Sequence, residues 1–285
     1  MEKIKIIECP RDAMQGMKEF IPTKLKTDYI NSLIQCGFDT IDFGSFVSPK
    51  AIPQMRDTAD VLNGLKLNNT TKLLAIVANE RGAEDALQFD QIDYLGYPFS
   101  VSEVFQMRNT NASIEESLTR VERIQNLLTS KGKQLVVYLS MGFGNPYNEI
   151  WNSEIVVKWS KILSEKIGVQ IIAPSDTIGC AKEEDVKELF ITLQSELKNV
   201  EFGAHLHTRL ENTQSLIQAA FDAGCRRFDT AIKGFGGCPM AKDELTGNLP
   251  TEVLLNWFKM NNIDATIKEK EFEYAFEFSA RIFNV

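Results

Sequence analysis

The sequence predicts an α/β fold in which eight parallel strands, each followed by a helix, close into a TIM (β/α)8 barrel with an additional C-terminal helical segment. Three observations predict it. Eight short β-rich apolar runs alternate with segments of helical periodicity. The 285 residues are sufficient for such a barrel, which needs roughly 250. No linker, repeat or low-complexity segment divides the chain. A doubly wound open sheet is the alternative.

The predicted strands and helices follow one another in strict alternation. The strands cover residues 3–9, 40–44, 73–78, 92–97, 135–141, 170–174, 202–207 and 228–232. The helices cover residues 23–36, 53–65, 82–89, 114–130, 153–167, 183–197, 211–223 and 251–261. Because each helix returns the chain to the same end of the sheet, the strands run parallel. Residues 268–283, which are charged and aromatic, predict an extra helix packed on the barrel or on a partner.

Capping signals mark the ends of several predicted helices. Ser113 and Glu116 have the spacing of a capping box at the start of the fourth helix. Four helices end at a glycine, which tolerates positive φ: Gly37, Gly132, Gly168 and Gly224. We expect a single domain over residues 1–285, with the barrel at about 3–263 and the helical extension at about 264–285.

Composition excludes several classes of protein. A formal charge of -8 argues against a nucleic-acid partner, which usually requires a basic face. No run of eighteen apolar residues is present, so we expect no membrane span. The five cysteines are odd in number and form no C-x-x-C pair, which argues against a disulfide framework and a cysteine zinc site. The amino terminus resembles a strand rather than a targeting segment, so we expect a cytoplasmic protein.

The two histidines of the chain, His205 and His207, both lie at the end of the seventh predicted strand. Residues i and i+2 of a strand project to one face, so both imidazoles point into the barrel at the end where such folds place active sites. Two aligned imidazoles can hold a divalent cation. The alternative is a pair of hydrogen-bonded or exposed histidines without a metal.

Arg11 and Asp12 follow the first predicted strand and emerge at the same rim. Asp12 can add a carboxylate ligand to the two imidazoles, and Arg11 can stabilise an enolate or carboxylate oxygen beside the metal. The alternative is an ordinary Arg–Asp surface pair.

Further polar residues fall at other strand ends. Asp42 and Asp176 can orient a ligand or serve as acid or base, although Asp176 equally suits a helix N-cap. A glycine-rich loop after the eighth strand carries Cys238 over the site. Asn248, after this loop, supplies an amide oxygen for a hard cation.

Several motifs in this order make nearly the whole chain resemble the 3-hydroxy-3-methylglutaryl-CoA lyases, a branch of the barrel metallolyases. The most diagnostic is Ser45-Phe-Val-Ser-Pro-Lys50, which continues to Pro53-Gln-Met55. The supporting motifs are Pro10-Arg-Asp12 with Gln15, Ser113-Ile-Glu-Glu-Ser117, Asn145-Pro-Tyr147, Asp176-Thr-Ile-Gly179, His205-Leu-His207, Gly236-Gly-Cys-Pro239 and Gly247-Asn-Leu249.

The resemblance implies a magnesium or manganese ion held by Asp12, His205, His207 and Asn248. It implies an acyl-CoA substrate that is cleaved between C2 and C3 to acetyl-CoA and acetoacetate. By similarity, Arg11 stabilises the thioester enolate, and Cys238 closes the site or assists proton transfer. The resemblance and the aromatic tail, residues 272–283, also imply a homodimer or a larger homo-oligomer.

Three departures separate the chain from the usual lyase pattern. Asp42 replaces a glutamate, and Thr208 replaces an aspartate after the second histidine. Third, the segment between Cys238 and Asn248 is one residue longer, and Pro10-Arg-Asp-Ala-Met-Gln15 lacks the usual glycine and leucine. Two alternatives therefore remain. One is a barrel aldolase or Claisen-type synthase acting on 2-oxo acids, and the other is a degenerate barrel that binds metal or acyl-CoA without catalysis. By charge, candidates for contacts with the coenzyme are Lys18, Lys50 and Lys233.

Overall fold

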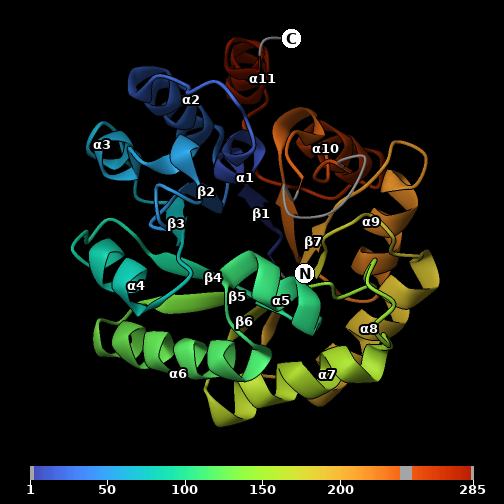
Figure 1. Cartoon of the computed structure of the whole chain (residues 1–285). Coiled ribbons are helices and arrows are strands. Elements are labelled where there is room, and N and C mark those ends of the chain that lie inside the picture. Colours follow the sequence, from blue (N-terminus) through green and yellow to red (C-terminus); the bar gives the residue numbers. More distant parts are fainter. Residues whose placement is uncertain (1–2, 238–245, 284–285) are drawn as a thin grey trace.

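Eight parallel strands close into a barrel in the computed structural model, which describes residues 3–237 and 246–283 (Figure 1). The strands are paired in sequence order, and the last strand pairs with the first. They are β1 (Lys5–Glu8), β2 (Thr40–Ser45), β3 (Lys72–Ile76), β4 (Tyr94–Ser100), β5 (Gln134–Ser140), β6 (Ile171–Asp176), β7 (Glu201–Leu206) and β8 (Arg227–Thr230). The predicted TIM barrel is therefore confirmed, and the open sheet is wrong.

The strands are buried on both faces, as parallel strands covered by helices must be. One apolar cluster fills the barrel and consists of Leu74, Ile76, Tyr94, Val136, Tyr138, Ile171 and Ala173. A larger cluster lies between the strands and the surrounding helices. The two clusters explain why the strand segments are almost continuously apolar.

The surrounding helices appear where periodicity predicted them (Figure 1). They are α2 (Thr23–Cys36), α3 (Thr58–Asn63), α4 (Glu80–Ala86), α6 (Ile114–Ser130), α7 (Ser153–Lys161), α8 (Glu183–Glu196), α9 (Thr213–Asp222) and α10 (Thr251–Met260). The capping box of Ser113 and Glu116 is present. The four glycines predicted at helix ends all have positive φ.

Two predicted helices are interrupted. Residues 53–65 form the 3-10 turn η1 (Pro53–Met55) and then α3, and the hydroxyl of Thr58 donates to the carbonyl of Met55 at the break. The same hydroxyl oxygen accepts from the amide of Ser45 and ties the break to β2. Residues 153–167 continue from α7 into the π-helix η2 (Ile162–Lys166).

Two short helices were not predicted, and both lie at the carboxyl end of the barrel. The sequence placed Arg11 and Asp12 directly after a strand, but they lie in α1 (Pro10–Gln15), and β1 ends at Glu8. The second is α5 (Glu103–Thr110), whose N-cap is Ser102, and the side chain of Ser102 accepts from the amide of Phe105. Figure 1 shows α5 in front of strands β4 to β6.

The predicted C-terminal helix is α11 (Glu269–Phe283), which packs against α2. Aromatic side chains contribute to this contact: Phe278 of α11 stacks on Tyr29 of α2, with ring centroids 5.9 Å apart. Figure 1 shows α11 outside the helical ring. Within residues 3–237 and 246–283, every helix is too short or too polar to span a bilayer.

Candidate active site

A cavity of about 140 Å³ opens at the carboxyl ends of the strands, where (β/α)8 barrels place their active sites. Polar groups from several strands converge on it above the apolar filling of the barrel. The polar and charged residues that line it are Arg11, Asp12, Gln15, Asn109, Tyr138, Ser140, Ser175, Thr177, His205 and His207. The structure therefore brings Arg11, Asp12 and the two histidines together in one cavity.

The two imidazoles and Asp12 form the centre of this cavity. The ring centroids of His205 and His207 lie 5.4 Å apart. Each of the three residues offers a ligand atom, and these atoms all lie within 4.8 Å of one another. His207 is 3% exposed, and its Nδ1 has no hydrogen-bond partner among the described residues. A buried nitrogen without a partner, beside a carboxylate and a second imidazole, fits a divalent cation.

Asp229 orients His205, and the sequence analysis did not identify it. Register places Asp229 on β8 directly beside His205 on β7, and its Oδ2 lies 3.1 Å from His205 Nδ1. Burial lowers the pKa of His205, but the hydrogen bond and charge of Asp229 prevail and raise it. Asp229 thus fixes the ring so that Nε2 is the nitrogen left for a metal. Thr208, where the lyases usually have an aspartate, instead accepts a hydrogen bond from the hydroxyl of Thr213 at 3.0 Å.

His207 has a different electrostatic environment. It lies just beyond β7 and forms an isolated bridge with Asn248. Burial, together with the charge of His205, lowers the pKa of His207 to about 4. A neutral imidazole is the form that ligates a metal.

Arg11 is held by carboxylates on two sides. Its Nε lies 3.0 Å from Asp42 Oδ2 and its Nη2 lies 2.5 Å from the same oxygen, while Nη1 donates to Asp12 Oδ1 at 2.9 Å. Both Arg11 and Asp12 are less than a tenth exposed, so they are not an ordinary surface pair. Burial raises the pKa of Asp42 to about 6 against the opposing charge of Arg11.

Asp12 is surrounded by donors. Burial acts to raise the pKa of Asp12, but the charges of Arg11 and the two histidines prevail and lower it. Gln15 Nε2 donates to Asp12 Oδ1 at 2.8 Å, and Asn248 Nδ2 donates to Asp12 Oδ2 at 2.7 Å. Asn248 therefore reaches the centre through its NH₂ group, and ligation through its oxygen requires the amide to turn over.

Asp176 lies apart from the cavity that its neighbours Ser175 and Thr177 line. Its carboxylate accepts from the amides of Cys180 at 3.0 Å and Ala181 at 2.8 Å. Burial raises its pKa. Asp176 therefore holds the loop before α8, but it is not the N-cap of that helix, which is Lys182. Cys238, the remaining predicted site residue, lies outside the described residues.

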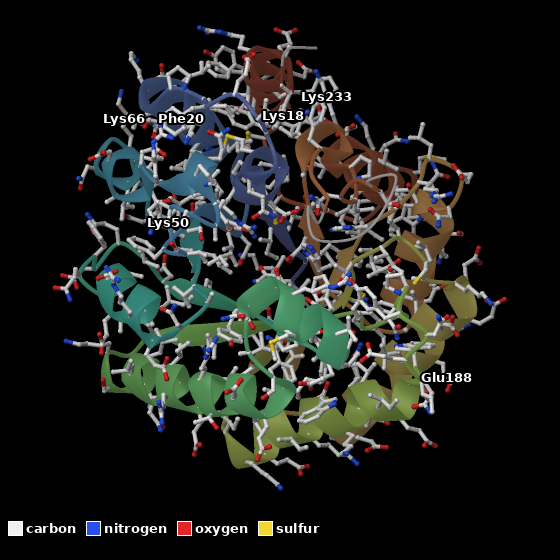
Figure 2. The ribbon with its side chains drawn as sticks, viewed as in Figure 1. Lys18, Phe20, Lys50, Lys66, Glu188 and Lys233 are labelled. Atoms are coloured by element: carbon white, nitrogen blue, oxygen red, sulfur yellow. The ribbon has the colours of Figure 1, made fainter. Side chains whose placement is uncertain are left out.

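A larger groove of about 870 Å³ adjoins the cavity and shares part of its wall, including Gln15 and Asn109. The cations that line it are Lys18, Arg56 and Arg108. Figure 2 labels Lys18 and Phe20, which both line this groove. Two of the predicted coenzyme contacts, Lys50 and Lys233, do not line it. Lys233 lies over the ring of Phe276, with its Nζ 5.0 Å from the centroid.

Comparison with known proteins connects this geometry to one family. The family model described as HMGL-like matches residues 3–278. The chain belongs to the HMGL-like family. Curated relatives that match most of the chain are named as hydroxymethylglutaryl-CoA lyases, which are carbon–carbon lyases. The hydroxymethylglutaryl-CoA lyase YngG of Bacillus subtilis is 31% identical over 268 residues, which cover 94% of this chain and 89% of the relative. The protein is therefore an enzyme, a lyase that acts on carbon–carbon bonds.

Two further relatives show the range within the HMGL-like family. A Pseudomonas aeruginosa protein named as a 3-hydroxy-3-isohexenylglutaryl-CoA and hydroxymethylglutaryl-CoA lyase is 30% identical over 255 residues, 89% of this chain and 84% of that protein. The structure of an HMG-CoA lyase from Acinetobacter baumannii, in complex with coenzyme A and 3-methylmalate, has a TM-score of 0.92 and 28% identity. That comparison covers 99% of this chain and 92% of the other.

Proposed function

We propose that this member of the HMGL-like family is a divalent-metal-dependent lyase that cleaves 3-hydroxy-3-methylglutaryl-CoA, or a close 3-hydroxyacyl-CoA, to acetyl-CoA and acetoacetate. The observation that carries the proposal is the convergence of Asp12, His205 and His207 beside Arg11, at the end of a groove with a cationic wall. The names of the relatives support the choice of substrate class.

Asp12, His205 and His207 would hold a magnesium or manganese ion, with Asn248 as a fourth ligand after its amide turns. A metal bound there supplies Lewis-acid polarisation of the substrate oxygens. Asp229 keeps His205 in the orientation that such ligation requires. The charge of Arg11 favours the ionised form of Asp12, which suits a cation.

Arg11 is placed to receive negative charge from the substrate. Of its five N–H groups, Nε and one on Nη2 are used by Asp42, and both on Nη1 are used by Asp12 and Gln15. One N–H on Nη2 remains for the thioester oxygen. When a base takes the proton of the C3 hydroxyl and the C2–C3 bond breaks, C3 becomes the ketone of acetoacetate, and the electron pair of the bond moves onto the thioester, where this N–H stabilises it.

The other predicted catalytic groups take supporting parts in the proposal. Asp42 orients Arg11, and Asp176 holds the loop whose Thr177 lines the cavity. Cys238, on its glycine-rich loop, would close the site or deliver the proton that converts the C2 carbanion to acetyl-CoA. Lys18, Arg56 and Arg108 would receive the phosphates of the coenzyme. We further propose a cytoplasmic homo-oligomer, in keeping with the scattered cysteines and the aromatic tail.

Product analysis with a panel of substrates tests this proposal. The purified protein with added Mg²⁺ or Mn²⁺ is mixed with 3-hydroxy-3-methylglutaryl-CoA, longer 3-hydroxyacyl-CoA analogues and 4-hydroxy-2-oxo acids, and acetyl-CoA, acetoacetate and pyruvate are measured. We expect acetyl-CoA with acetoacetate from the first substrate. Arg11→Gln should lower kcat/KM by about 10²–10³, while Arg81→Gln, an exposed control on α4, should match the native enzyme. Pyruvate as product, or no turnover of any thioester, would contradict the proposal.

A further inference from the structure

One wall of the groove beside the active-site cavity is a short segment without regular secondary structure. Residues 16–22 connect α1 to α2, and both Lys18 and Phe20 from this segment line the groove. Among the residues that the structure describes, positions 18–21 make no backbone–backbone hydrogen bond. The segment therefore needs partners from elsewhere in the chain to satisfy its backbone and to keep one conformation.

Gln54 supplies these partners through a single side-chain amide. Its Oε1 accepts from the amide of Ile21 at 2.9 Å, and its Nε2 donates to the carbonyls of Glu19 at 2.7 Å and Met17 at 3.3 Å. Within the described parts of the chain, these three backbone groups have no other hydrogen-bond partner. Gln54 is only 3% exposed, so loss of its amide would leave the three groups unpaired and release the segment.

The turn that contains Gln54 also holds the ring of Phe20. The Cζ of Arg56 lies 3.6 Å from the centroid of this ring, and the Nζ of Lys26 lies 4.2 Å from it. Lys26 is itself fixed, because its Nζ donates to the carbonyl of Gln54 and, at 2.7 Å, to Asp57 Oδ1. The segment and the cationic wall of the groove are thus built as one unit around η1.

We propose that Gln54 is a positioning residue, which fixes residues 17–21 as a wall of the groove and so sets the affinity for the coenzyme part of the substrate. This inference rests on the proposed function, in which Lys18 and Arg56 receive phosphates of the coenzyme. All the hydrogen bonds of the Gln54 side chain go to the segment, and none goes to Arg11 or Asp12. Loss of the amide should therefore weaken substrate binding and leave the chemical step unchanged.

Calorimetric titration with coenzyme A, together with steady-state kinetics on two substrates, tests this role. Gln54→Met keeps the length of the side chain but removes the amide. We expect it to weaken coenzyme A binding by at least about fivefold and to raise KM for 3-hydroxy-3-methylglutaryl-CoA similarly, with kcat within about twofold of the native value. The N-acetylcysteamine thioester of the same acid lacks the phosphates and adenosine, so its kcat/KM should not change.

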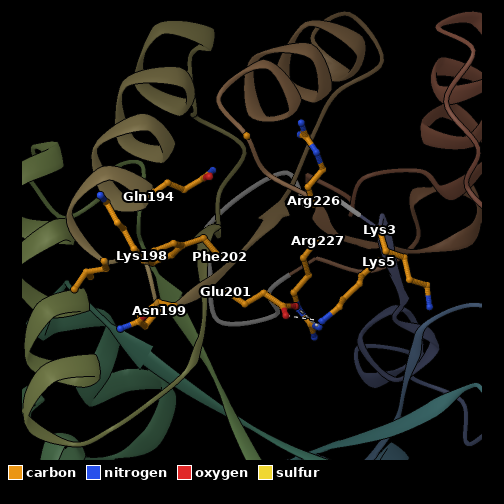
Figure 3. Close-up of a pocket in the computed structure, with 12 residues that line it drawn as sticks. Lys3, Lys5, Gln194, Lys198, Asn199, Glu201, Phe202, Arg226 and Arg227 are labelled. Carbon is orange, nitrogen blue, oxygen red and sulfur yellow. Dashed lines mark hydrogen bonds and ion pairs between the residues drawn. The ribbon is translucent and has the colours of Figure 1, made fainter. Parts of the chain in front are cut away.

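Two further variants control for folding and for general loss of stability. Gln194→Met removes a glutamine hydrogen bond, from Gln194 Nε2 to the carbonyl of Ala223 at 2.8 Å, at the other end of the barrel. Figure 3 shows Gln194 in a pocket that Glu201 and Arg227, the first residues of β7 and β8, also line. This variant should keep native coenzyme A affinity. If Gln54→Met does not fold, Gln54→Glu, which retains only the acceptor, should weaken coenzyme A binding by at least about twofold.

The possible outcomes separate this role from the proposed function. Equal coenzyme A affinity in the native protein and in the folded Gln54 variant would overturn the positioning role alone. A fall in kcat with both substrates, or an equal loss of affinity in Gln194→Met, would also overturn it. Absence of coenzyme A binding to the native protein would contradict the proposed function, and the positioning role with it.

Discussion

At the scale of single residues, the contact between Arg11 and Asp42 sets the orientation of the Arg11 guanidinium in the active site. Asp42 is 1% exposed and engages the guanidinium through Nε and Nη2. Replacing Asp42 with asparagine removes the carboxylate charge but keeps the shape of the side chain. Arg11 then stays buried with a weaker partner, and its free N–H loses its fixed direction. The shorter carboxylate at this position is therefore compatible with a fully formed ion pair.

We predict that Asp42→Asn lowers kcat/KM for the thioester substrate by about 10²-fold. Asp42→Glu, which retains the charge and restores the residue usual in the lyases, should stay within about tenfold of the native enzyme. Steady-state kinetics of both variants provide the measurement. Equal activity of the asparagine variant and the native enzyme would show that Arg11 does not depend on Asp42.

At the scale of elements, Glu8 connects the first strand with the last part of the barrel. This fully buried carboxylate accepts from the amide of Ile232 at 2.9 Å and from the hydroxyls of Thr230 and Thr251. It thereby joins β1, β8, the turn that leads to the glycine-rich loop, and the start of α10. Burial, opposed by these hydrogen bonds, raises its pKa to about 8.

The raised pKa of Glu8 gives a pH dependence of stability with a definite sign. Between the ordinary value of 4.5 and about 8, the folded state retains a proton that the unfolded state has lost. The contribution of Glu8 to the free energy of unfolding therefore falls as pH rises, by at most about 1.4 kcal/mol per pH unit. We predict that Glu8→Gln gains stability relative to the native protein from pH 5 to pH 8.

Urea denaturation at several pH values measures this difference. Glu122→Gln, at an exposed position of α6, is the control and should show no such trend. A difference between Glu8→Gln and the native protein that does not change with pH would mean that Glu8 is ionised in the folded state. If the stability of Glu8→Gln relative to the native protein were lower at high pH than at low pH, the trend would have the wrong sign for a buried, protonated carboxyl.

At the scale of the whole molecule, the barrel could be predicted because its signals are local and repeated. Alternation of apolar runs with helical periodicity identified all eight strands. Helix α1 has six residues and begins at a proline, so it is too short to show a period. Helix α5 has eight residues and only a weak apolar face. These two elements therefore escaped prediction.

Only part of the site could be predicted, because one of its contacts depends on how two neighbouring strands pair. The i and i+2 spacing of His205, on β7, and His207, just beyond its end, predicts that they point the same way, and this spacing is visible in the sequence. The contact of His205 with Asp229 depends on how β7 pairs with β8, and that pairing is not visible in a single sequence. In the same way, the sequence could suggest Asp176 as acid, base or cap, but only the fold shows its contacts with backbone amides.

Titration of the metal-free enzyme with Mn²⁺ tests the central claim most directly, with bound ion counted by electron paramagnetic resonance and acetoacetate release measured in the same samples. We predict that activity rises in proportion to bound Mn²⁺ up to about one ion per chain. His207→Asn, verified as folded by circular dichroism, should lose both Mn²⁺ binding and acetoacetate release. Full activity in EDTA without bound metal, or unchanged Mn²⁺ binding in His207→Asn, would contradict a metal centre built on Asp12, His205 and His207.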